Sequence, residues 1–241
     1  MIMKIEVLYP KICNLFGDAM NAEYLRRALS EAEYITTSLK ERPRFVDEKV
    51  DIIYMGSMTE TGQGLVAQAL LPYRARILEL INSGTVFLIT GNALEIFGKY
   101  IENEDGTRVE TLGIFDLYAK RQMMRRYNSL YLGTFGDIEI VGFKSQFAHN
   151  YDVGEGSIPA LFETLRGAGR KPKQKEEGVR LNNFLATNVL GPILPLNPLF
   201  AHYILSLLGI KERELPYEQE AIASYEARLR EFKDPKTGSE Y

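Results

Sequence analysis

The sequence predicts an α/β protein built on a doubly wound, mostly parallel sheet that is flanked by helices and carries an antiparallel extension. Two patterns predict this class. In the first hundred residues, short apolar runs that stop at a glycine or a loop alternate with amphipathic stretches of helical period. Beyond residue 112, segments of two-residue alternation are separated by glycine-containing turns, as is typical of antiparallel strands. Ligands of doubly wound sheets bind at the carboxyl ends of the parallel strands.

The first half of the chain is expected to hold three strands with helices between them. Each strand is predicted from a short apolar run that is followed by a turn residue, over residues 4–8, 51–56 and 85–90. Each helix is predicted from apolar residues at helical spacing, over residues 21–31, 63–83 and 92–100. Pro72 is expected to kink or split the second of these helices.

The second half is expected to be more irregular. Strands are predicted by two-residue alternation over residues 114–121, 138–144 and 180–187. Residues 165–177 are expected to form a basic, glycine-containing loop. Helices are predicted over 197–208 and 218–232, and the second carries an apolar stripe that should dock on the body of the protein: Ile222, Tyr225, Leu229 and Phe232. We expect one domain over residues 1–241, with a flexible tail at 233–241.

Composition excludes several classes of function. With 29 basic and 32 acidic residues the net charge is −3, which argues against a general nucleic-acid binder. One cysteine and two histidines exclude an intrachain disulfide and the usual cysteine–histidine metal sites, so no metal or cofactor is expected. Such sparse use of cysteine fits a reducing, cytoplasmic setting.

No targeting or transmembrane segment is expected. The first ten residues are interpreted as the first strand, because their apolar run is too short for a signal peptide. The longest stretch without a charged residue, 181–210, has the length of a membrane span. It contains several asparagines and prolines, whose polar groups would be unsatisfied in lipid, so it is interpreted as strand, turn and helix.

The sharpest local feature is the segment from Phe87 to Gly98, in which a buried strand runs through Gly91 directly into a predicted helix. Asn92 and Glu95 stand at capping-box spacing in the first helical turn. Elbows of this kind hold a nucleophile in many α/β enzymes, where backbone N–H groups of the helix stabilise an oxyanion. Here Thr90 is the nearest hydroxyl, and no histidine is close in sequence. A turn that merely requires a small residue is the alternative interpretation.

Short blocks along almost the whole chain, read together, carry a family resemblance. They are Asn14-Leu-Phe-Gly-Asp18 with Asn21, Asp51-Ile-Ile-Tyr-Met-Gly56 with Gln63, the elbow followed by Gly98-Lys-Tyr and Asp105-Gly-Thr, Leu112-Gly-Ile-Phe-Asp-Leu-Tyr118, Val141-Gly-Phe143, and Gly191-Pro-Ile-Leu-Pro195 with Asn197. In this order and spacing they resemble class I, triad-type glutamine amidotransferases of the cobyric acid synthase group, especially the GatD-type glutaminase subunit of lipid II isoglutaminyl synthase. The resemblance implies a flavodoxin-like fold.

The resemblance also implies a reaction whose reactive groups this chain lacks. In the family, an elbow cysteine attacks the glutamine amide, a histidine before the Gly-Pro-Ile-Leu-Pro run transfers protons, and ammonia passes to an ATP-dependent, Mur-ligase-like partner. Here Gly91 stands at the cysteine position and Leu190 at the histidine position. The family elbow Cys-Gly-Gly-Tyr-Gln reads Gly91-Asn92-Ala93-Leu94-Glu95, and an Asn-His-Gly segment reads Ser145-Gln146-Phe147. Glycine has no side chain to attack with, and leucine cannot transfer a proton.

We therefore predict a degenerate amidotransferase without catalytic residues, which acts as a binding or regulatory subunit. Its vestigial, ligand-binding cleft is expected to include six residues: Gly56, Ser57, Gln63, Asn92, Glu95 and Arg125. By the resemblance, Ser57 and Asn92 fall near the oxyanion-hole backbone, and Arg125 matches an arginine that binds substrate. The expected partners are a Mur-ligase-like protein in the bacterial cytoplasm and a small ligand such as glutamine or another carboxylate.

Two other functions stay open. The chain could be an enzyme that uses Cys13, Thr90, Asp18 or Glu95, or a residue supplied by a partner. It could instead be a small-molecule module in which Arg125 binds a carboxylate.

The remaining reactive residues have structural interpretations. Cys13 is expected to be a buried thiol, His149 an exposed loop residue, and His202 a packed or half-exposed helix residue. Asp18 and Asp116 would pair only if the fold brings them together. Two basic segments, 120–126 and 165–177, are either solvated surface or contacts for an acidic partner or a phosphorylated ligand.

Overall fold

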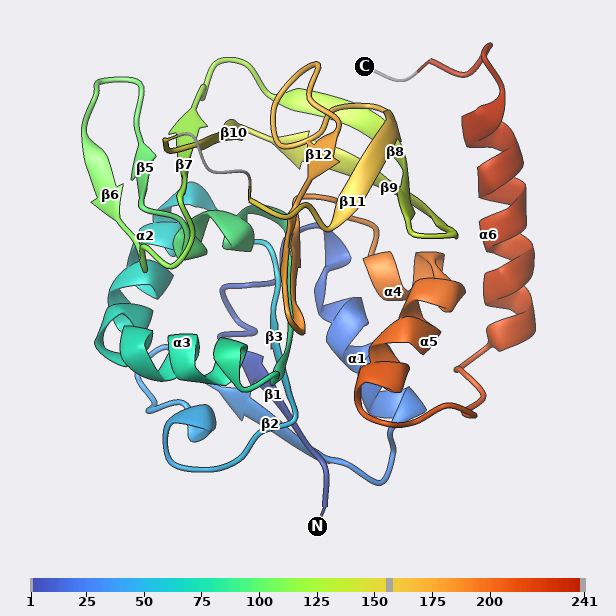
Figure 1. Cartoon of the computed structure of the whole chain (residues 1–241), viewed down its shortest axis with the longest axis horizontal. Helices are drawn as coiled ribbons and strands as arrows, with labels where there is room; N and C mark the ends of the chain where they lie inside the picture. The colour runs from blue at the N-terminus through green and yellow to red at the C-terminus, as the bar shows by residue number, and fades with distance from the viewer. Residues whose placement is uncertain (1, 155–157, 239–241) are drawn as a thin grey trace.

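A computed structural model describes residues 2–154 and 158–238 of the chain (Figure 1). Its centre is a six-stranded sheet in the order β13-β14-β4-β3-β1-β2. Five strands are parallel, and β13 is antiparallel to β14. The strands are β1 (Lys4–Leu8), β2 (Glu33–Thr37), β3 (Ile52–Met55), β4 (Val86–Thr90), β13 (Val179–Leu181) and β14 (Phe184–Thr187). The predicted doubly wound α/β class is confirmed, and the chain reverses direction of winding between β1 and β3, where such sheets bind ligands.

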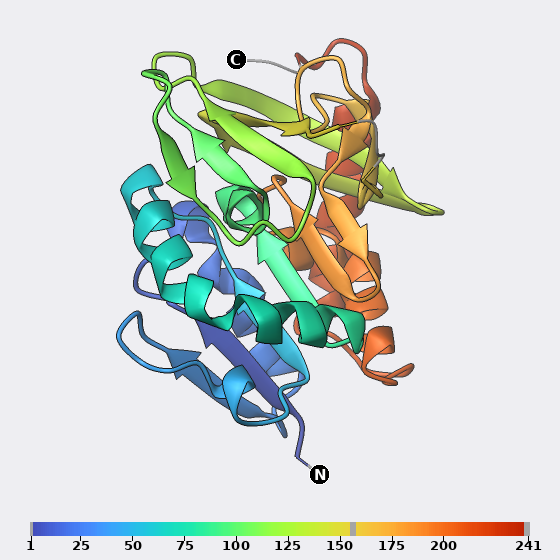
Figure 2. The same cartoon turned by 60° about the vertical axis from the view of Figure 1, so that its left-hand side comes forward.

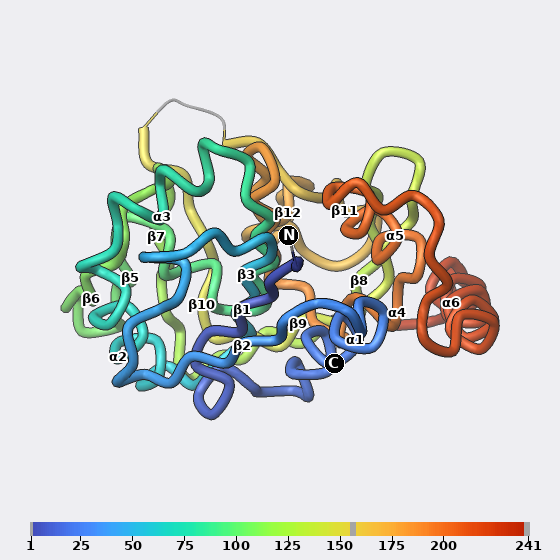
Figure 3. The backbone as a smooth tube through the Cα atoms, turned by 90° about the horizontal axis from the view of Figure 1, so that it is seen from below, coloured from blue at the N-terminus to red at the C-terminus, as the bar shows by residue number. Residues whose placement is uncertain are grey.

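Helices cover both faces of this sheet (Figures 1 and 3). Alternate residues of each strand point to opposite faces. Ile53 and Phe87 pack with the helices of one face, and Ile52 and Leu88 with those of the other. The first face carries α2 (Glu60–Leu70), the 3-10 turn η3 (Leu71–Tyr73) and α3 (Arg74–Asn82), and the second carries α1 (Ala19–Ala28), α4 (Ile193–Leu196) and α5 (Pro198–Leu207). The predicted helix 63–83 is therefore split around Pro72, as expected.

Two four-stranded sheets form the expected extension, which lies beyond the carboxyl end of the central sheet (Figure 2). Their strand pairs are antiparallel except for β5 and β7, which are parallel. One has the order β10-β7-β5-β6 and the other β12-β11-β8-β9. Their strands are β5 (Tyr100–Glu102), β6 (Arg108–Glu110), β7 (Leu117–Arg121), β8 (Tyr127–Phe135), β9 (Ile138–Gln146), β10 (Ala148–Asp152), β11 (Phe162–Arg166) and β12 (Glu176–Glu177). Only the segments of β7 and β9 were expected from alternation.

Three sequence predictions need correction. Residues 180–187 form a hairpin of β13 and β14, because Asn182 adopts a left-handed conformation with φ of 52° and reverses the chain. Residues 92–100 do not form an α-helix; the 3-10 segment η4 (Gly91–Phe97) is followed by β5. The carbonyls of Ile96 and Phe97 accept hydrogen bonds from residues 112–115, so they are not available to continue a helix. The ends of the expected loop 165–177 belong to β11 and β12.

The last long helix, α6 (Glu218–Lys233), packs outside β8 and β9 through Tyr225 and Phe232, with Leu229 beside them. Ile222 of the predicted stripe is exposed. After the helix, the guanidinium of Arg166 donates to the backbone carbonyls of Phe232, Asp234 and Thr237. Residues 239–241 of the expected tail lie outside the described residues. No helix in the described ranges has the length and apolarity that crossing a bilayer requires.

The shorter 3-10 turns are η1 (Leu15–Gly17) and η2 (Arg44–Val46). The first follows β1 and carries Phe16, whose φ of 59° is rare for a residue with a side chain. This places the β1–α1 connection over the carboxyl ends of β3 and β4.

Candidate functional site

The elbow lies at the carboxyl edge of β4, where Gly91 has φ of 62°. Glycine suits this conformation because it has no Cβ to clash with the backbone. A Cβ added to Gly91 would lie 2.5 Å from Cβ of Ser57 and 3.0 Å from Cδ2 of Leu190. The two positions that the family resemblance assigns to catalysis, 91 and 190, are therefore next to each other. Neither offers a group that could attack or transfer a proton.

Ser57 follows β3 and is held by the β1–α1 connection. Its backbone N–H donates to Oδ2 of Asp18 at 2.8 Å, and its hydroxyl donates to the carbonyl of Leu15 at 2.9 Å. The N–H of Leu15 in turn donates to the carbonyl of Ser57 at 3.0 Å. The backbone N–H that the resemblance places near an oxyanion hole is thus already hydrogen-bonded to a carboxyl group.

Asn92 joins the elbow to the end of β3. Its Oδ1 accepts from the N–H of Met58 at 2.9 Å, and its Nδ2 donates to the carbonyl of Met58 at 2.7 Å. Both ends of the side-chain amide are therefore used in fixing two loops to each other. Gly56 lies behind them, where a Cβ would meet the carbonyl oxygen of Cys13 at 2.8 Å. Its role is to let these loops approach closely.

A cavity of about 40 Å³ opens beside the elbow. By volume it holds on the order of three water molecules. Its walls bring together residues from the β1–α1 connection, the end of β3, α2, η4, β7, β9 and the segment after β14. They are Leu15, Phe16, Ser57, Met58, Glu60, Gln63, Gly91, Asn92, Glu95, Arg121, Arg126, Ser145, Gln146, Phe147, Ala148, Asn188 and Leu190. Four of the six predicted cleft residues are among them: Ser57, Gln63, Asn92 and Glu95.

The predicted arginine is not at the cavity. Arg125 and Arg126 are both exposed in the connection between β7 and β8, but only Arg126 lines the cavity. The guanidinium of Arg126 lies 4.6 Å from the ring centre of Phe147 and 5.8 Å from that of Phe16, at distances typical of cation–π contacts. Arg126, and not the predicted Arg125, is therefore the arginine that lines the cavity.

One wall of the cavity is a chain of polar side chains. Nε2 of Gln63 donates to Oε2 of Glu95 at 2.8 Å and to the carbonyl of Asn92 at 2.7 Å. Oε1 of Gln63 accepts from the guanidinium of Arg121 at 2.7 Å. Arg121 also donates to Oδ1 of Asn103 and to the carbonyl of Glu60. Arg121 belongs to the basic segment that was interpreted either as solvated surface or as a contact for an acidic partner or a phosphorylated ligand. It is a buried residue of β7.

Glu95 is 1% exposed, and burial raises its pKa to about 7. The hydrogen bond from Gln63 and the positive charge of Arg121 oppose that rise, and the charge of Glu60 adds to it. The wall therefore contains a carboxyl group that changes charge near neutral pH. Its Oε1, together with Nε of Arg121 and Oε1 of Gln146, finds no hydrogen-bond partner in the described part of the chain.

Of the four alternative reactive residues, Glu95 lines the cavity, whereas Cys13, Asp18 and Thr90 do not. Cys13 is buried, its Sγ is 3.9 Å from Sδ of Met58, and burial raises its pKa to about 12. It is a thiol, not a thiolate, at neutral pH. The hydroxyl of Thr90 donates to Oδ2 of Asp18 at 2.6 Å beneath the elbow. Burial raises the pKa of Asp18, while hydrogen bonds from Thr90 and Ser57 oppose the rise.

The histidines and Asp116 do not join the site. His149 is a buried residue of β10, not an exposed loop residue, because that strand pairs with β7 along its length. Its Nδ1 is 3.1 Å from Nε2 of Gln146, and burial, helped by the charge of Lys144, lowers its pKa to about 4. His202 contacts Glu218 at 2.6 Å on the helical side of the molecule, half-exposed as expected.

Asp116 pairs with Lys99 at the surface, at 2.8 Å, so it does not form a carboxyl pair with the buried Asp18. Within residues 2–154 and 158–238, no group of three histidine, cysteine, aspartate or glutamate side chains is arranged to hold a metal ion.

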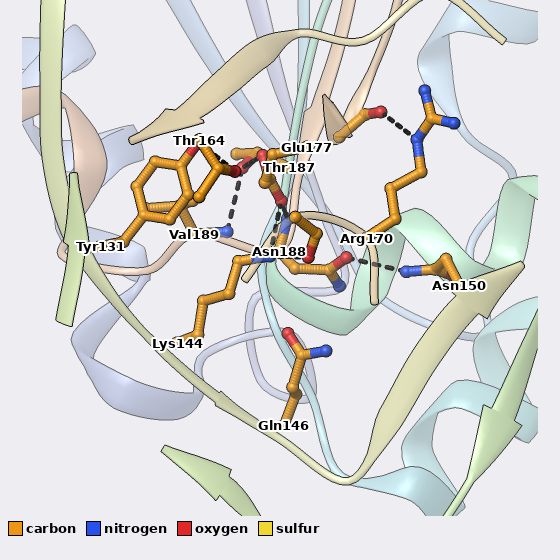
Figure 4. A network of polar contacts seen from close by, with 12 residues as sticks. Tyr131, Lys144, Gln146, Asn150, Thr164, Arg170, Glu177, Thr187, Asn188 and Val189 are labelled. Atoms are coloured by element: carbon orange, nitrogen blue, oxygen red, sulfur yellow. Dashed lines mark hydrogen bonds and ion pairs between the residues drawn. The ribbon is translucent and has the colours of Figure 1, made fainter. Parts of the chain in front are cut away.

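A buried network fixes the segment that carries Leu190 (Figure 4). Nζ of Lys144 lies 3.3 Å from Oε1 of Glu177, and both side chains are fully buried. Glu177 also accepts from the hydroxyl of Thr187 at 2.6 Å and from the N–H of Asn188 at 2.9 Å. Nδ2 of Asn188 donates to the carbonyl of Gly91 at 3.2 Å. Sequence reasoning missed this network, because its members come from separate strands.

Comparison with known proteins agrees with this geometry. No family model matches the chain. The GatD subunit of lipid II isoglutaminyl synthase (glutamine-hydrolyzing) from Staphylococcus aureus (strain N315) is 28% identical over 214 residues, which cover 87% of this chain and 85% of that one. The subunit of the same name from Streptococcus pneumoniae (strain ATCC BAA-255 / R6) is 25% identical over 256 aligned positions, covering 99% and 94%.

Solved structures show the same fold. A glutamine amidotransferase crystal structure matches with a TM-score of 0.57 at 16% identity, covering 86% of this chain and 99% of that one. A glutamine amidotransferase from Thermotoga maritima matches with a TM-score of 0.51 at 10% identity, covering 97% and 93%. The chain is thus similar in sequence to GatD subunits and similar in fold to glutamine amidotransferases of known structure.

Proposed function

We propose that this chain is a GatD-like subunit that has lost glutaminase activity and serves as a binding or regulatory component. The observation that carries the proposal is the elbow itself. Gly91 has no side chain, and the space for one is filled by Ser57 and Leu190 at 2.5 and 3.0 Å. Loss of members of a nucleophile–base pair costs roughly 10⁴- to 10⁶-fold in turnover.

Two further features of the site support the loss of activity. The N–H of Ser57 is bonded to Asp18 and cannot also stabilise an oxyanion without breaking that bond. The cavity beside the elbow is small, about 40 Å³, which corresponds to a few water-sized groups. Both features support a loss of catalysis at the position where the family resemblance expects the substrate.

The proposed setting follows from the relatives. Both matched proteins are bacterial subunits of a lipid II isoglutaminyl synthase, and this chain aligns with 85% and 94% of their lengths. We place the chain in the bacterial cytoplasm, as the companion of a Mur-ligase-like protein in the amidation of peptidoglycan precursors. There it would stabilise or regulate the partner, and ammonia would come from another source.

A glutaminase assay tests the proposal. The purified chain, alone and with a Mur-ligase-like protein from the same organism, is incubated with glutamine, and glutamate and ammonia are measured. The S. aureus GatD relative with its own partner is the positive control. We expect no release above the rate without protein. Turnover comparable to that of the control, in either condition, would show that the chain is an active glutaminase.

A further inference from the structure

The absence of a nucleophile and a base does not by itself explain why the elbow has no space for a side chain at position 91. We call this arrangement the closed elbow. We infer that Ser57 is a positioning residue that keeps the elbow closed: held by the β1–α1 connection, it occupies the place of the first side-chain atom of any nucleophile at position 91. The inference rests on the proposed function, since it concerns an elbow without a nucleophile. It adds that a cysteine introduced at position 91 would not have room for its side chain unless Ser57 were also changed.

The distances separate Ser57 from the other neighbour of the elbow. A Cβ on Gly91 would be 2.5 Å from Cβ of Ser57 and 3.3 Å from its Cα. Carbon atoms in contact are normally about 3.5–4.0 Å apart. Leu190 approaches with Cδ2, the end of a flexible side chain, at 3.0 Å, so it can move aside. Cβ of Ser57 is attached to the backbone and moves only if the backbone moves.

The backbone of Ser57 is fixed at every polar group. Its N–H donates to Asp18, its carbonyl accepts from the N–H of Leu15, and its hydroxyl donates to the carbonyl of Leu15. Asp18 is itself held by Thr90 at 2.6 Å and by Nδ2 of Asn21 at 3.0 Å. All of these groups are buried or partly buried. Displacing Ser57 would therefore break several hydrogen bonds at once.

A double-mutant cycle measures the contact. Gly91→Ala is made in the parent, in Ser57→Gly and in Ser57→Ala, and denaturation midpoints are compared. The strain of a side chain at positive φ is the same in all three backgrounds, so it cancels. We expect Gly91→Ala to lower the midpoint much less in the Ser57→Gly background, recovering about half or more of the loss. Ser57→Ala retains the Cβ and should recover little.

Thiol reactivity gives a second readout of the space beside position 91. Gly91→Cys is labelled with iodoacetamide in the parent and Ser57→Gly backgrounds, and peptide mapping separates the new thiol from Cys13. We expect labelling about ten-fold faster with Ser57→Gly, because the thiol can then adopt an exposed position. Equal labelling rates together with equal losses in the cycle would overturn the inference. Neither measurement depends on glutamine hydrolysis, so a failure here is distinct from glutaminase activity in the parent.

Discussion

Two groups of buried polar side chains near the elbow differ in how their hydrogen-bonding atoms are satisfied. In the group at the β1–α1 connection, both carboxyl oxygens of Asp18 accept hydrogen bonds, from Asn21 on one and from Ser57 and Thr90 on the other. In the other group, Oε1 of Glu95 and Nε of Arg121 have no partner among the described residues. The Asp18 group is a closed hydrogen-bonded unit, whereas the Glu95 wall of the cavity is not.

This difference predicts separate roles for the two groups: one maintains the local structure, and the other changes charge with pH. A buried carboxyl group whose oxygens are all bonded contributes mainly to holding loops together. A buried carboxyl group with a free oxygen and a pKa of about 7 changes charge under ordinary conditions. We therefore expect the Asp18 group to determine whether the elbow keeps its shape, and the Glu95 group to determine how the site responds to pH.

The largest effect is expected from Asp18→Ala. The change leaves the buried N–H of Ser57 without its acceptor and removes one of the two partners of the Thr90 hydroxyl and of the Asn21 amide. We expect it to lower the free energy of unfolding by on the order of 4 kcal/mol, measured by urea denaturation. Asp116→Ala is the control, because its carboxylate is exposed and pairs only at the surface. Similar losses for both variants would contradict the closed-unit description.

The second effect is a pH dependence that comes from Glu95. Its pKa is about 7 in the folded state and near 4.5 when unfolded, so the folded state binds the proton more tightly. Stability from this group is full below about pH 4.5 and is lost as the pH rises to about 7, by about 3 kcal/mol. Glu95→Gln should remove this slope, so that the variant is the more stable protein at pH 8.

Urea denaturation of the parent and of Glu95→Gln between pH 4.5 and 8 checks this prediction. The difference between the two proteins isolates Glu95 from Asp18, whose pKa burial also raises. Parallel curves for the two proteins over this range would show that Glu95 is already ionised in the fold.

Much of this fold was predictable, because the strands around residues 4–8, 51–56 and 85–90 are short apolar runs, and such runs are expected to form buried strands. The elbow after β4 was predictable for the same reason. The nature of η4 was not, since the carbonyls of Ile96 and Phe97 bond to residues that follow much later in the chain. Local spacing cannot report such long-range competition.

The residues of the site were likewise predictable only in part. Gly91, Glu95 and Gln63 could be found from motifs, whereas the contact of Ser57 with Gly91 depends on how three separate segments meet. Two adjacent arginines, Arg125 and Arg126, are equivalent in sequence, and only the geometry of the β7–β8 connection decides which one lines the cavity.

The smallest effect compares those two arginines. Arg126→Ala removes contacts of the guanidinium with two aromatic rings at the cavity, and we expect a loss of about 0.5–1 kcal/mol. Arg125→Ala should stay within about 0.5 kcal/mol of the parent, as exposed substitutions usually do. Matched thermal denaturation of the pair measures the difference. A larger loss for Arg125→Ala would reverse the assignment.

The central claim, that no nucleophile faces this elbow, is tested most directly by covalent capture. The native chain and the S. aureus GatD relative are treated with a glutamine-like diazoketone, and intact masses are recorded. We predict one adduct on the relative and none on this chain. A stoichiometric adduct on the chain that maps to Ser57, Thr90 or Cys13 would contradict the account.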